Sequence, residues 1–417
     1  MYRSNLFLIS LAFTLLFIAC KPAADQPSLV VQIENPTVYD LEDITLGIPV
    51  NKEFINAKTW QDNSLVAIIG ETRVPVQWAH TDPEKKDVFY LNTNITSMEK
   101  TGVVIRPEKP GDTLQAVKMT HAELWYKTGG SFENGKYIGG SEFKPFTNLR
   151  VPDECTDHSY YIKYEGPGWE SDKVGYRIYL DWRNAIDIFG KKTSHMVLPD
   201  VGLDGYDSYH EMSDWGADIL KVGNSLGIGS LGFWDGEKAN RVAETDSVIC
   251  NIAQDGINYS EVKINYYGWK INETSVNLQT SLSILGGSRM TKYQIAMSEE
   301  LPNLCTGIVK LDGAEWLKGN QTEGWNYMAT WGKQTLFNDL LGMAVLFRQD
   351  SPAEITEDEL SYVVLMSPAD NRVEYYFLAA WEQEPNGITS KEEFIEYLDQ
   401  QVTLLNNPVK ISVELPE

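Results

Sequence analysis

The chain has 417 residues, of which 42% are hydrophobic and 11% are aromatic. This composition is that of a globular protein with one large core or two linked ones, and it excludes a disordered or fibrous chain. The formal net charge of −24 excludes DNA and RNA as partners, because phosphate binding needs an excess of Lys and Arg on one face.

The first twenty residues predict a secretion leader. Arg3 precedes an apolar run from Leu6 to Ile18, and Cys20 follows almost directly. This layout is typical of a bacterial lipoprotein signal, and the run is too short to span a bilayer comfortably. We therefore expect residues 1–20 to be a signal peptide with lipidation at Cys20, so that the lipid anchors the protein to a membrane face in the periplasm or at the outer membrane. An uncleaved N-terminal anchor is the alternative.

Residues 21–28 predict a short polar tether, and most of the remaining chain predicts short β-strands. Apolar or alternating runs bounded by Pro, Gly and Asn recur at 29–40, 43–50, 64–80, 87–95, 101–107, 121–127, 158–166, 247–269, 275–285, 289–297, 343–349, 360–367 and 372–382. Many strands at this spacing favour a large antiparallel β-sandwich over a parallel α/β fold.

Helix signals are few along the chain. The best is residues 391–406, with Ser390 as its N-cap. We predict an N-terminal β region over 29–114 and a main β-sandwich over 115–417, with one continuous domain as the alternative.

The segment from Glu165 to Lys192 combines arginines, carboxylates and aromatic residues. If residues 174–183 form a strand, its two faces are a core face of Val174, Tyr176, Ile178, Leu180 and Trp182 and a polar cleft face of Arg177, Tyr179, Asp181 and Arg183. Between Lys173 and Lys192 five cations oppose two carboxylates. This local positive charge in an acidic protein predicts a site for an anionic, ring-shaped ligand, with a solvated strand end as the alternative.

A second cluster of polar and aromatic residues lies among the glycines of residues 204–232. His210 is its main catalytic candidate, because imidazole titrates near neutral pH and is the default proton acceptor. Tyr209 precedes it, and His158 is a weaker candidate beside Asp157. A loop histidine held by structural hydrogen bonds is the alternative for each.

We expect no metal ion and no other cofactor, because the sequence has no HxH or HExxH spacing. A mononuclear site built from His158, His210 and either Glu211 or Asp214 is the alternative. The cysteines at 155, 250 and 305 are too widely spaced for a zinc pair. We expect buried, unreactive thiols, with one disulfide as the alternative.

Other segments add candidate substrate-binding residues. Arg289 follows a Gly-Gly-Ser turn, and Lys310 ends the segment NLCTGIVK. Indole rings stack on the C–H faces of sugars, although many tryptophans must fill the core. The candidate binding set is Arg183, Trp169, Trp215, His158, Arg289, Lys310 and Trp331.

At residues 166–192, 208–229, 286–293 and 303–310, the chain resembles a family of Bacteroidetes secreted lipoproteins long listed as a domain of unknown function. The resemblance covers roughly residues 30–405. Members of that family are commonly encoded in gene clusters for polysaccharide breakdown, and some are oligosaccharide dehydratases acting on terminal uronic acids. The resemblance implies a large β-sandwich similar to those of galactose mutarotases and polysaccharide lyases. It points to Arg177, Tyr179, Arg183 and His210 as cleft residues.

The residues and the resemblance together predict a carbon–oxygen lyase that eliminates water from the non-reducing-end uronic acid of an oligosaccharide. Arg177 or Arg183 would neutralise the sugar carboxylate, and His210 would take the proton. Tyr179 or Tyr209 would protonate the leaving hydroxide. A glycoside hydrolase or polysaccharide lyase acting on uronic-acid glycans, and a non-catalytic glycan-binding lipoprotein, are the alternatives.

Overall fold

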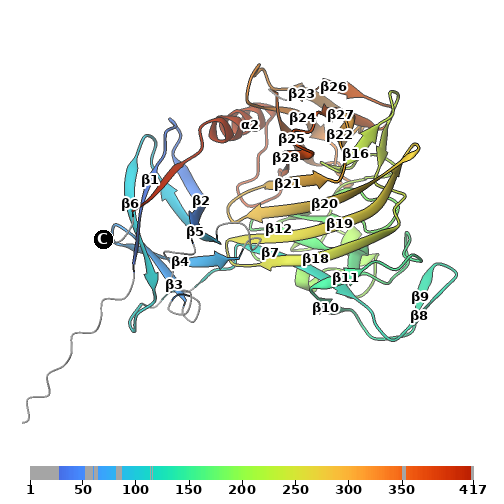
Figure 1. Ribbon diagram of the computed structural model, residues 1–417, viewed down its shortest axis with the longest axis horizontal. Helices are drawn as coiled ribbons and strands as arrows, with labels where there is room; N and C mark the ends of the chain where they lie inside the picture. Colours follow the sequence, from blue (N-terminus) through green and yellow to red (C-terminus); the bar gives the residue numbers. More distant parts are fainter. Residues whose placement is uncertain are drawn as a thin grey trace, which may run out of the picture.

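The computed structural model describes residues 28–51, 60, 64–80, 87–112, 114, 116–349 and 354–414. The predicted leader, its lipidation at Cys20 and the tether up to residue 27 lie outside these ranges. Two β-domains lie side by side, with one complete α-helix in the described ranges (Figure 1). The predicted mostly β fold class is confirmed. None of the helices in the described part of the chain has the length and apolar character needed to cross a membrane.

The N-terminal domain is one antiparallel sheet with its own core. In spatial order its strands are β2 (Leu41–Val50), β5 (Asp87–Ile95), β4 (Thr72–Ala79), β3 (Leu65–Ile69), β6 (Lys100–Pro107), β1 (Leu29–Glu34) and β29 (Lys410–Glu414). Alternation along β1 buries Val31 and Ile33.

The last strand of this sheet comes from the other end of the chain, since Val413 pairs with Val31. The predicted division at residue 115 assigned residues 410–414 to the main domain, whereas they belong to the N-terminal sheet. The sequence of a five-residue strand does not indicate which strand it pairs with.

The main domain is a β-sandwich. Its larger layer has nine strands, in the order β11 (Asn148–Arg150), β18 (Ser247–Asp255), β19 (Tyr259–Ile271), β20 (Thr274–Leu285), β21 (Met290–Met297), β28 (Arg372–Trp381), β25 (Leu340–Arg348), β24 (Trp325–Lys333) and β23 (Ala314–Lys318). Alternate side chains of this sheet, such as Ile264 and Phe377, form one face of the largest core cluster.

Two smaller sheets form the opposing layer. One has the order β10 (Lys144–Phe146), β7 (Thr120–Tyr126), β12 (Gly168–Ser171), β13 (Val174–Ile178), β14 (Ile186–Lys191) and β15 (Gly216–Asp218). The other has the order β17 (Ala239–Arg241), β16 (Gly232–Trp234), β22 (Leu304–Val309), β27 (Ser361–Met366) and β26 (Glu354–Glu357). A hairpin of β8 (Ser131–Glu133) and β9 (Lys136–Ile138) projects beside them (Figure 1).

The two layers are joined by buried contacts in the core. Trp169 Nε1 donates to Thr291 Oγ1 at 2.9 Å, and the Tyr176 hydroxyl donates to the Arg289 carbonyl at 2.8 Å. Cys250 and Cys305 lie buried as free thiols, and Cys155 is a half-buried one. Among the described cysteines no disulfide forms.

Helix α2 (Lys391–Asn406) covers the outer face of the nine-stranded sheet at β24 and β25. It begins with a capping box, because the Ser390 hydroxyl accepts from the Glu393 N–H and the Glu393 carboxylate accepts from the Ser390 N–H. Phe394, Leu398 and Val402 recur every four residues and are buried against the sheet. The predicted helix and its N-cap are confirmed.

Loops cover the outer face of the six-stranded sheet and shield it from solvent. Residues from the loops around 158–166 and 197–209 form a separate apolar cluster over β12, β13 and β14. The strand predicted over 174–183 ends at Ile178, and Trp182, expected in the core, is 47% exposed. The two faces of β13 are as predicted, but its polar face lies beneath these loops.

Candidate active site

Arg177 lies at the centre of a buried polar network on the covered face of β13. It is 2% exposed. Its Nη2 donates to Asp187 at 2.8 Å, to Asp218 at 2.5 Å and to the Tyr179 hydroxyl at 2.9 Å. Its Nη1 donates to the Tyr209 hydroxyl at 3.0 Å. Asp187 comes from the neighbouring strand β14, directly opposite Arg177 in register, and Asp218 ends β15.

The guanidinium of Arg177 has no donor left for a ligand. Nε also bonds Asp187, and Nη1 also bonds the Tyr164 carbonyl at 3.2 Å. All of its N–H groups point to partners within the network, so it does not fit the predicted role of a cation that contacts a sugar carboxylate. Its contacts suit a residue that positions the two phenols and the two carboxylates around it.

His210 is the exposed member of this network. It ends a short 3₁₀ turn, η4 (Ser208–His210), and 45% of its side chain is exposed. Its Nε2 lies 3.4 Å from Asp218 Oδ2, and its ring lies 4.5 Å from the Tyr209 ring. Burial and the positive charge of Arg177 lower the pKa of His210. The imidazole is therefore neutral at neutral pH, the state that a general base requires.

The carboxyl oxygens of Asp218 accept fewer hydrogen bonds than those of its neighbour Asp187. Burial and the negative charge of Asp187 raise the pKa of Asp218 well above the usual range of a carboxyl. Its Oδ1 is buried and has no hydrogen-bond partner among the described residues. Asp187, by contrast, accepts from Arg177, from the Tyr179 hydroxyl and from the Ile188 N–H. Asp218 is the carboxyl of the pair that more readily carries a proton.

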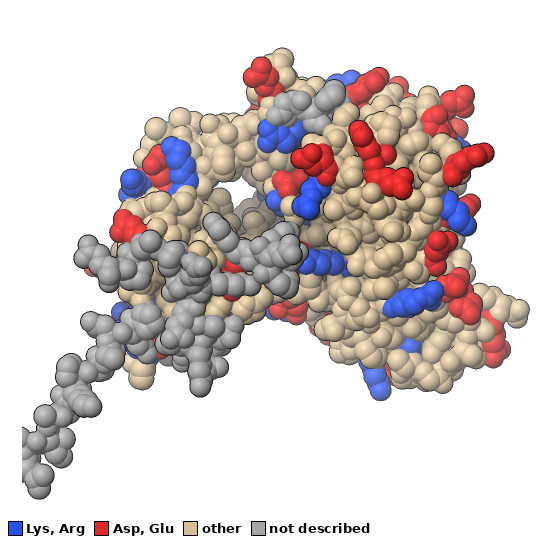
Figure 2. Space-filling model, in the orientation of Figure 1, with Lys and Arg blue, Asp and Glu red and all other residues tan. Residues whose placement is uncertain are grey.

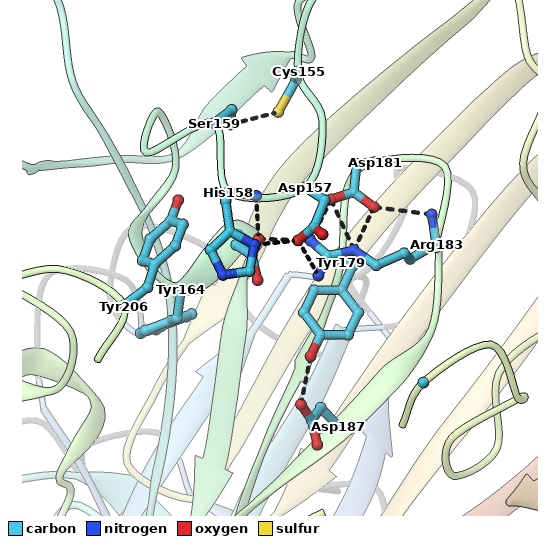
Figure 3. A network of polar contacts seen from close by, with 12 residues as sticks. Cys155, Asp157, His158, Ser159, Tyr164, Tyr179, Asp181, Arg183, Asp187 and Tyr206 are labelled. Carbon is cyan, nitrogen blue, oxygen red and sulfur yellow. Dashed lines mark hydrogen bonds and ion pairs between the residues drawn. The ribbon is translucent and has the colours of Figure 1, made fainter. Parts of the chain in front are cut away.

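A second network surrounds Arg183 and shares Tyr179 with the first (Figure 3). Arg183 lies 4.0 Å from the centre of the Tyr179 ring, and the Tyr179 hydroxyl donates to Asp187 at 2.7 Å. Arg183 bonds Asp181 through Nε at 2.9 Å and Glu165 through Nη2 at 2.7 Å. Tyr179 thus joins two guanidinium–carboxylate groups into one site.

The exposed edge of this second network is formed by Asp157 and His158. Arg183 Nη1 lies 2.8 Å from Asp157, whose side chain is 43% exposed. His158 Nδ1 lies 2.6 Å from the same carboxylate, and its side chain is 59% exposed. The His158 backbone N–H donates to Glu165 at 2.9 Å.

Asp157, His158 and Glu165 form the one set of described residues whose geometry could hold a metal ion, with one ligand atom from each lying within 4.8 Å of the others. Both carboxylates already bind Arg183, so an ion would have to compete with a guanidinium. This set differs from the alternative weighed from the sequence. His210 does not join His158 there, because it lies against Asp218.

The loop that carries this edge has an unusual backbone. His158, Tyr160, Tyr164 and Glu165 have φ values of 54°, 57°, 38° and 69°. Each left-handed residue other than glycine costs roughly 1 kcal/mol or more and persists only where its surroundings impose it, as they often do at functional sites. Four such residues within eight positions place this strain beside both networks.

Of the five cations in the positive patch predicted between Lys173 and Lys192, four are paired with carboxylates, and Lys192 forms no ion pair with a described residue. Arg177 and Arg183 are paired as described, Lys191 lies 2.5 Å from Glu170, and Lys173 lies 3.1 Å from Asp172. Most of these partner carboxylates stand outside the counted segment. On the face shown in Figure 2, acidic and basic side chains are interspersed in the same way.

Several predicted binding residues lie away from both networks. Trp169 is fully buried in the sandwich core, and Trp331 is buried against Phe394 of α2. Neither ring offers a face to a sugar. Arg289 pairs with Glu384, and Lys310 pairs with Glu357.

Trp215 packs on Phe189, the ring that also contacts Tyr209. It therefore lies beside the Arg177 network without joining its hydrogen bonds. Sequence reasoning assigned no role to Asp187, Asp218 or Glu165. Asp187 lies 10 positions from Arg177, on the next strand of a hairpin, so the sequence could have predicted this pair. Asp218 lies 41 positions from Arg177, and no pattern in the sequence predicts that contact.

A family model described as a domain of unknown function (DUF4861) matches residues 33–411. Among curated proteins, no sequence matches this chain. Similar solved structures include an alpha-mannosidase from Enterococcus faecalis V583, with 8% identity, a TM-score of 0.44 and coverage of 93% of this chain and 46% of that chain. Another is a protein in glycosyl hydrolase family 38 from Enterococcus faecalis, with 10% identity, a TM-score of 0.43 and coverage of 93% and 47%. This chain spans about half the length of each.

Proposed function

This chain belongs to the family described as a domain of unknown function (DUF4861), and we propose that it is a carbohydrate-active lyase. It removes water from the non-reducing-end uronic acid of an oligosaccharide and leaves an unsaturated uronyl residue. The half-exposed, neutral His210, seated on Asp218 beside the Tyr209 phenol, supports this proposal most directly. The resemblance of the sequence motifs supports the substrate class.

The elimination breaks the C–H bond at carbon five and the C–O bond at carbon four, and a double bond forms between these carbons. Neutral His210 accepts the proton from carbon five. Asp218, whose Oδ2 lies 3.4 Å from the imidazole, orients the ring of His210. A positioned general base of this kind typically contributes about 10²- to 10⁴-fold in rate.

The proton for the departing hydroxide comes from Tyr209. Its hydroxyl accepts from Arg177, and no described residue accepts the phenol proton in turn. Tyr179 differs, because its phenol already donates to Asp187 at 2.7 Å. Of the two tyrosines considered from the sequence, Tyr209 is therefore the general acid and Tyr179 is a positioning residue.

The sugar carboxylate is held at the exposed edge by Arg183 and His158. Arg177 has no free donor, whereas Arg183 Nη1 is bonded to the half-exposed Asp157. Solvent-exposed ion pairs are weak, typically below about 1 kcal/mol. A substrate carboxylate can take the place of Asp157 on Arg183 Nη1, while Nε and Nη2 stay bonded to Asp181 and Glu165.

Mass spectrometry of uronic-acid oligosaccharides incubated with the protein tests this proposal. The expected product has lost one water and absorbs in the ultraviolet. Gain of one water identifies a glycoside hydrolase, cleavage without water uptake a polysaccharide lyase, and an unchanged mass with measurable binding a glycan-binding protein. His210→Ala should abolish the ultraviolet signal and keep the fold. His80→Ala, a histidine with a 55% exposed side chain in the N-terminal domain, should leave it unchanged.

A further inference from the structure

Trp182 presents its indole ring to solvent immediately beside two residues of the candidate active site. The residue is 47% exposed, while its neighbours Asp181 and Arg183 are bound into the buried network. Aromatic residues are enriched at binding interfaces relative to the rest of a protein surface. Indole is also the side chain best suited to stack on a sugar ring.

Two surface hollows meet at Trp182. One, of about 470 Å³, is also lined by Cys155, Thr156 and Asp181, so it adjoins the loop that carries the exposed edge of the active site. The other, of about 510 Å³, is lined by Trp182, Asn240 and Arg241. Both volumes lie within the usual range of small-ligand sites, about 300 to 1,000 Å³. Trp182 and Ala243 line both hollows, so the hollow at Arg241 adjoins the one at the active-site edge.

Arg241 is the cation of the second hollow. Its guanidinium lies 5.6 Å from the centre of the Trp182 ring, and its Nη1 donates to the carbonyls of Gly223 and Ser225 at 3.3 and 3.1 Å. Unlike Arg177 and Arg183, it forms no ion pair with any carboxylate of the described residues. Burial lowers the pKa of Arg241, as expected of a half-buried cation without a partner. Its Nε and Nη2 donate to no described residue.

Asp358, a carboxylate that lines this hollow, is bonded to backbone N–H groups and forms no ion pair with Arg241. Asp358 accepts hydrogen bonds from the backbone N–H groups of Ala239, Leu360 and Ser361, at 2.9, 2.8 and 2.7 Å. The remaining acidic lining residues, Glu237 and Glu359, are exposed, and water and salt screen such charges.

We propose that the hollow between Trp182 and Arg241 is a distal subsite for the third or fourth sugar of the substrate chain, counted from the non-reducing end. The ring of this sugar packs on Trp182, and an oxyanion on it, either a carboxylate or a sulfate ester, binds Arg241. The inference rests on the proposed function, since it takes the sugar at His210 as the chain end. It implies a substrate longer than a disaccharide.

Calorimetry on the His210→Ala variant tests the subsite without turnover. The probes are disaccharides and tetrasaccharides of chondroitin, heparosan and polygalacturonate, with sulfated chondroitin as the arm that separates sulfate from carboxylate. In at least one series the tetrasaccharide should bind at least tenfold more tightly than the disaccharide. Trp182→Ala should remove this gain in tetrasaccharide affinity and leave disaccharide affinity unchanged. Arg241→Met should remove the part of the gain that depends on the carboxylate or sulfate of the distal sugar.

Tyr267→Ala is the matched control, because Tyr267 is an exposed aromatic residue that lines neither hollow. Equal tetrasaccharide affinity in Trp182→Ala and its parent overturns the subsite, as does the absence of any gain with chain length in all series. Mass spectrometry of the wild-type reaction separates the two proposals. A length gain without dehydration keeps the subsite and rejects the dehydratase, whereas dehydration without a length gain does the reverse.

Discussion

His210 Nε2 lies 3.4 Å from Oδ2 of Asp218, the same oxygen that accepts from Arg177 at 2.5 Å. An exposed imidazole is thereby tied to a fully buried guanidinium through one carboxyl group. The pair of carboxyls around Arg177 is also unequal, because Asp187 is fully hydrogen-bonded and Asp218 is not.

Asp218→Asn should cost less than about 1 kcal/mol of unfolding free energy, because an amide resembles the protonated carboxyl that its raised pKa favours. Asp187→Asn should cost about 3 kcal/mol or more, because it breaks a buried pair with Arg177. Urea denaturation of both variants at neutral pH measures the difference. Equal losses would show that both carboxyls are ionised.

Tyr209→Phe should lower kcat by about 10²- to 10⁴-fold, since it removes the proposed general acid. Tyr179→Phe should keep most of the activity and instead lower the free energy of unfolding by about 1 to 2 kcal/mol, since it removes the hydrogen bond to Asp187. Kinetics and denaturation of the two variants form a matched pair. A larger loss of kcat in Tyr179→Phe would exchange the two roles.

The pH dependence of kcat/KM should follow His210 on its acid side. Burial and the charge of Arg177 lower its pKa from the usual 6.5, so the neutral base persists below that pH. The value of kcat/KM should therefore increase with pH through a midpoint below 6.5, because His210 loses its proton over this range. Circular dichroism at each pH excludes unfolding as the cause. A midpoint above 6.5 would assign the acid limb to another group.

Stability at alkaline pH should depend on His121. It lies 2.9 Å from Asp255 and 3.0 Å from Glu123. Burial disfavours its charge, but these two carboxylates outweigh burial and raise its pKa to about 9. Its contribution, at most about 3 kcal/mol, is complete below pH 6.5 and is lost as the pH rises through 9.

Denaturation at a series of pH values checks this expectation. His121→Gln should flatten the decline in unfolding free energy between pH 6.5 and 9.5. A decline as steep as that of the wild type would place its origin elsewhere.

Turnover should be unchanged, within about twofold, after dialysis against EDTA. The residues that could hold a metal ion are Asp157, His158 and Glu165, and their two carboxylates bind Arg183 instead. Kinetics with and without added Mn²⁺, Ca²⁺ or Zn²⁺ provide the measurement. A loss that one of these ions restores would contradict a metal-free mechanism.

The sequence by itself determined the features that depend on near neighbours along the chain. Strand alternation predicted the mostly β fold and the two faces of β13, with Tyr176 in the core and Arg177 opposite. Helix periodicity and a capping serine predicted α2 with its bounds. Such patterns are local, because propensity, capping and alternation act over a few residues.

Only the tertiary structure decided which polar face is open and which charges are free. Arg177 is buried because loops distant in the sequence cover its sheet, and it is hydrogen-bonded to Asp218 from another strand. Trp182 is exposed because β13 ends before it. β29 returns to the N-terminal sheet. Burial and ion pairing depend on contacts between distant segments, and no local pattern in the chain encodes those partners.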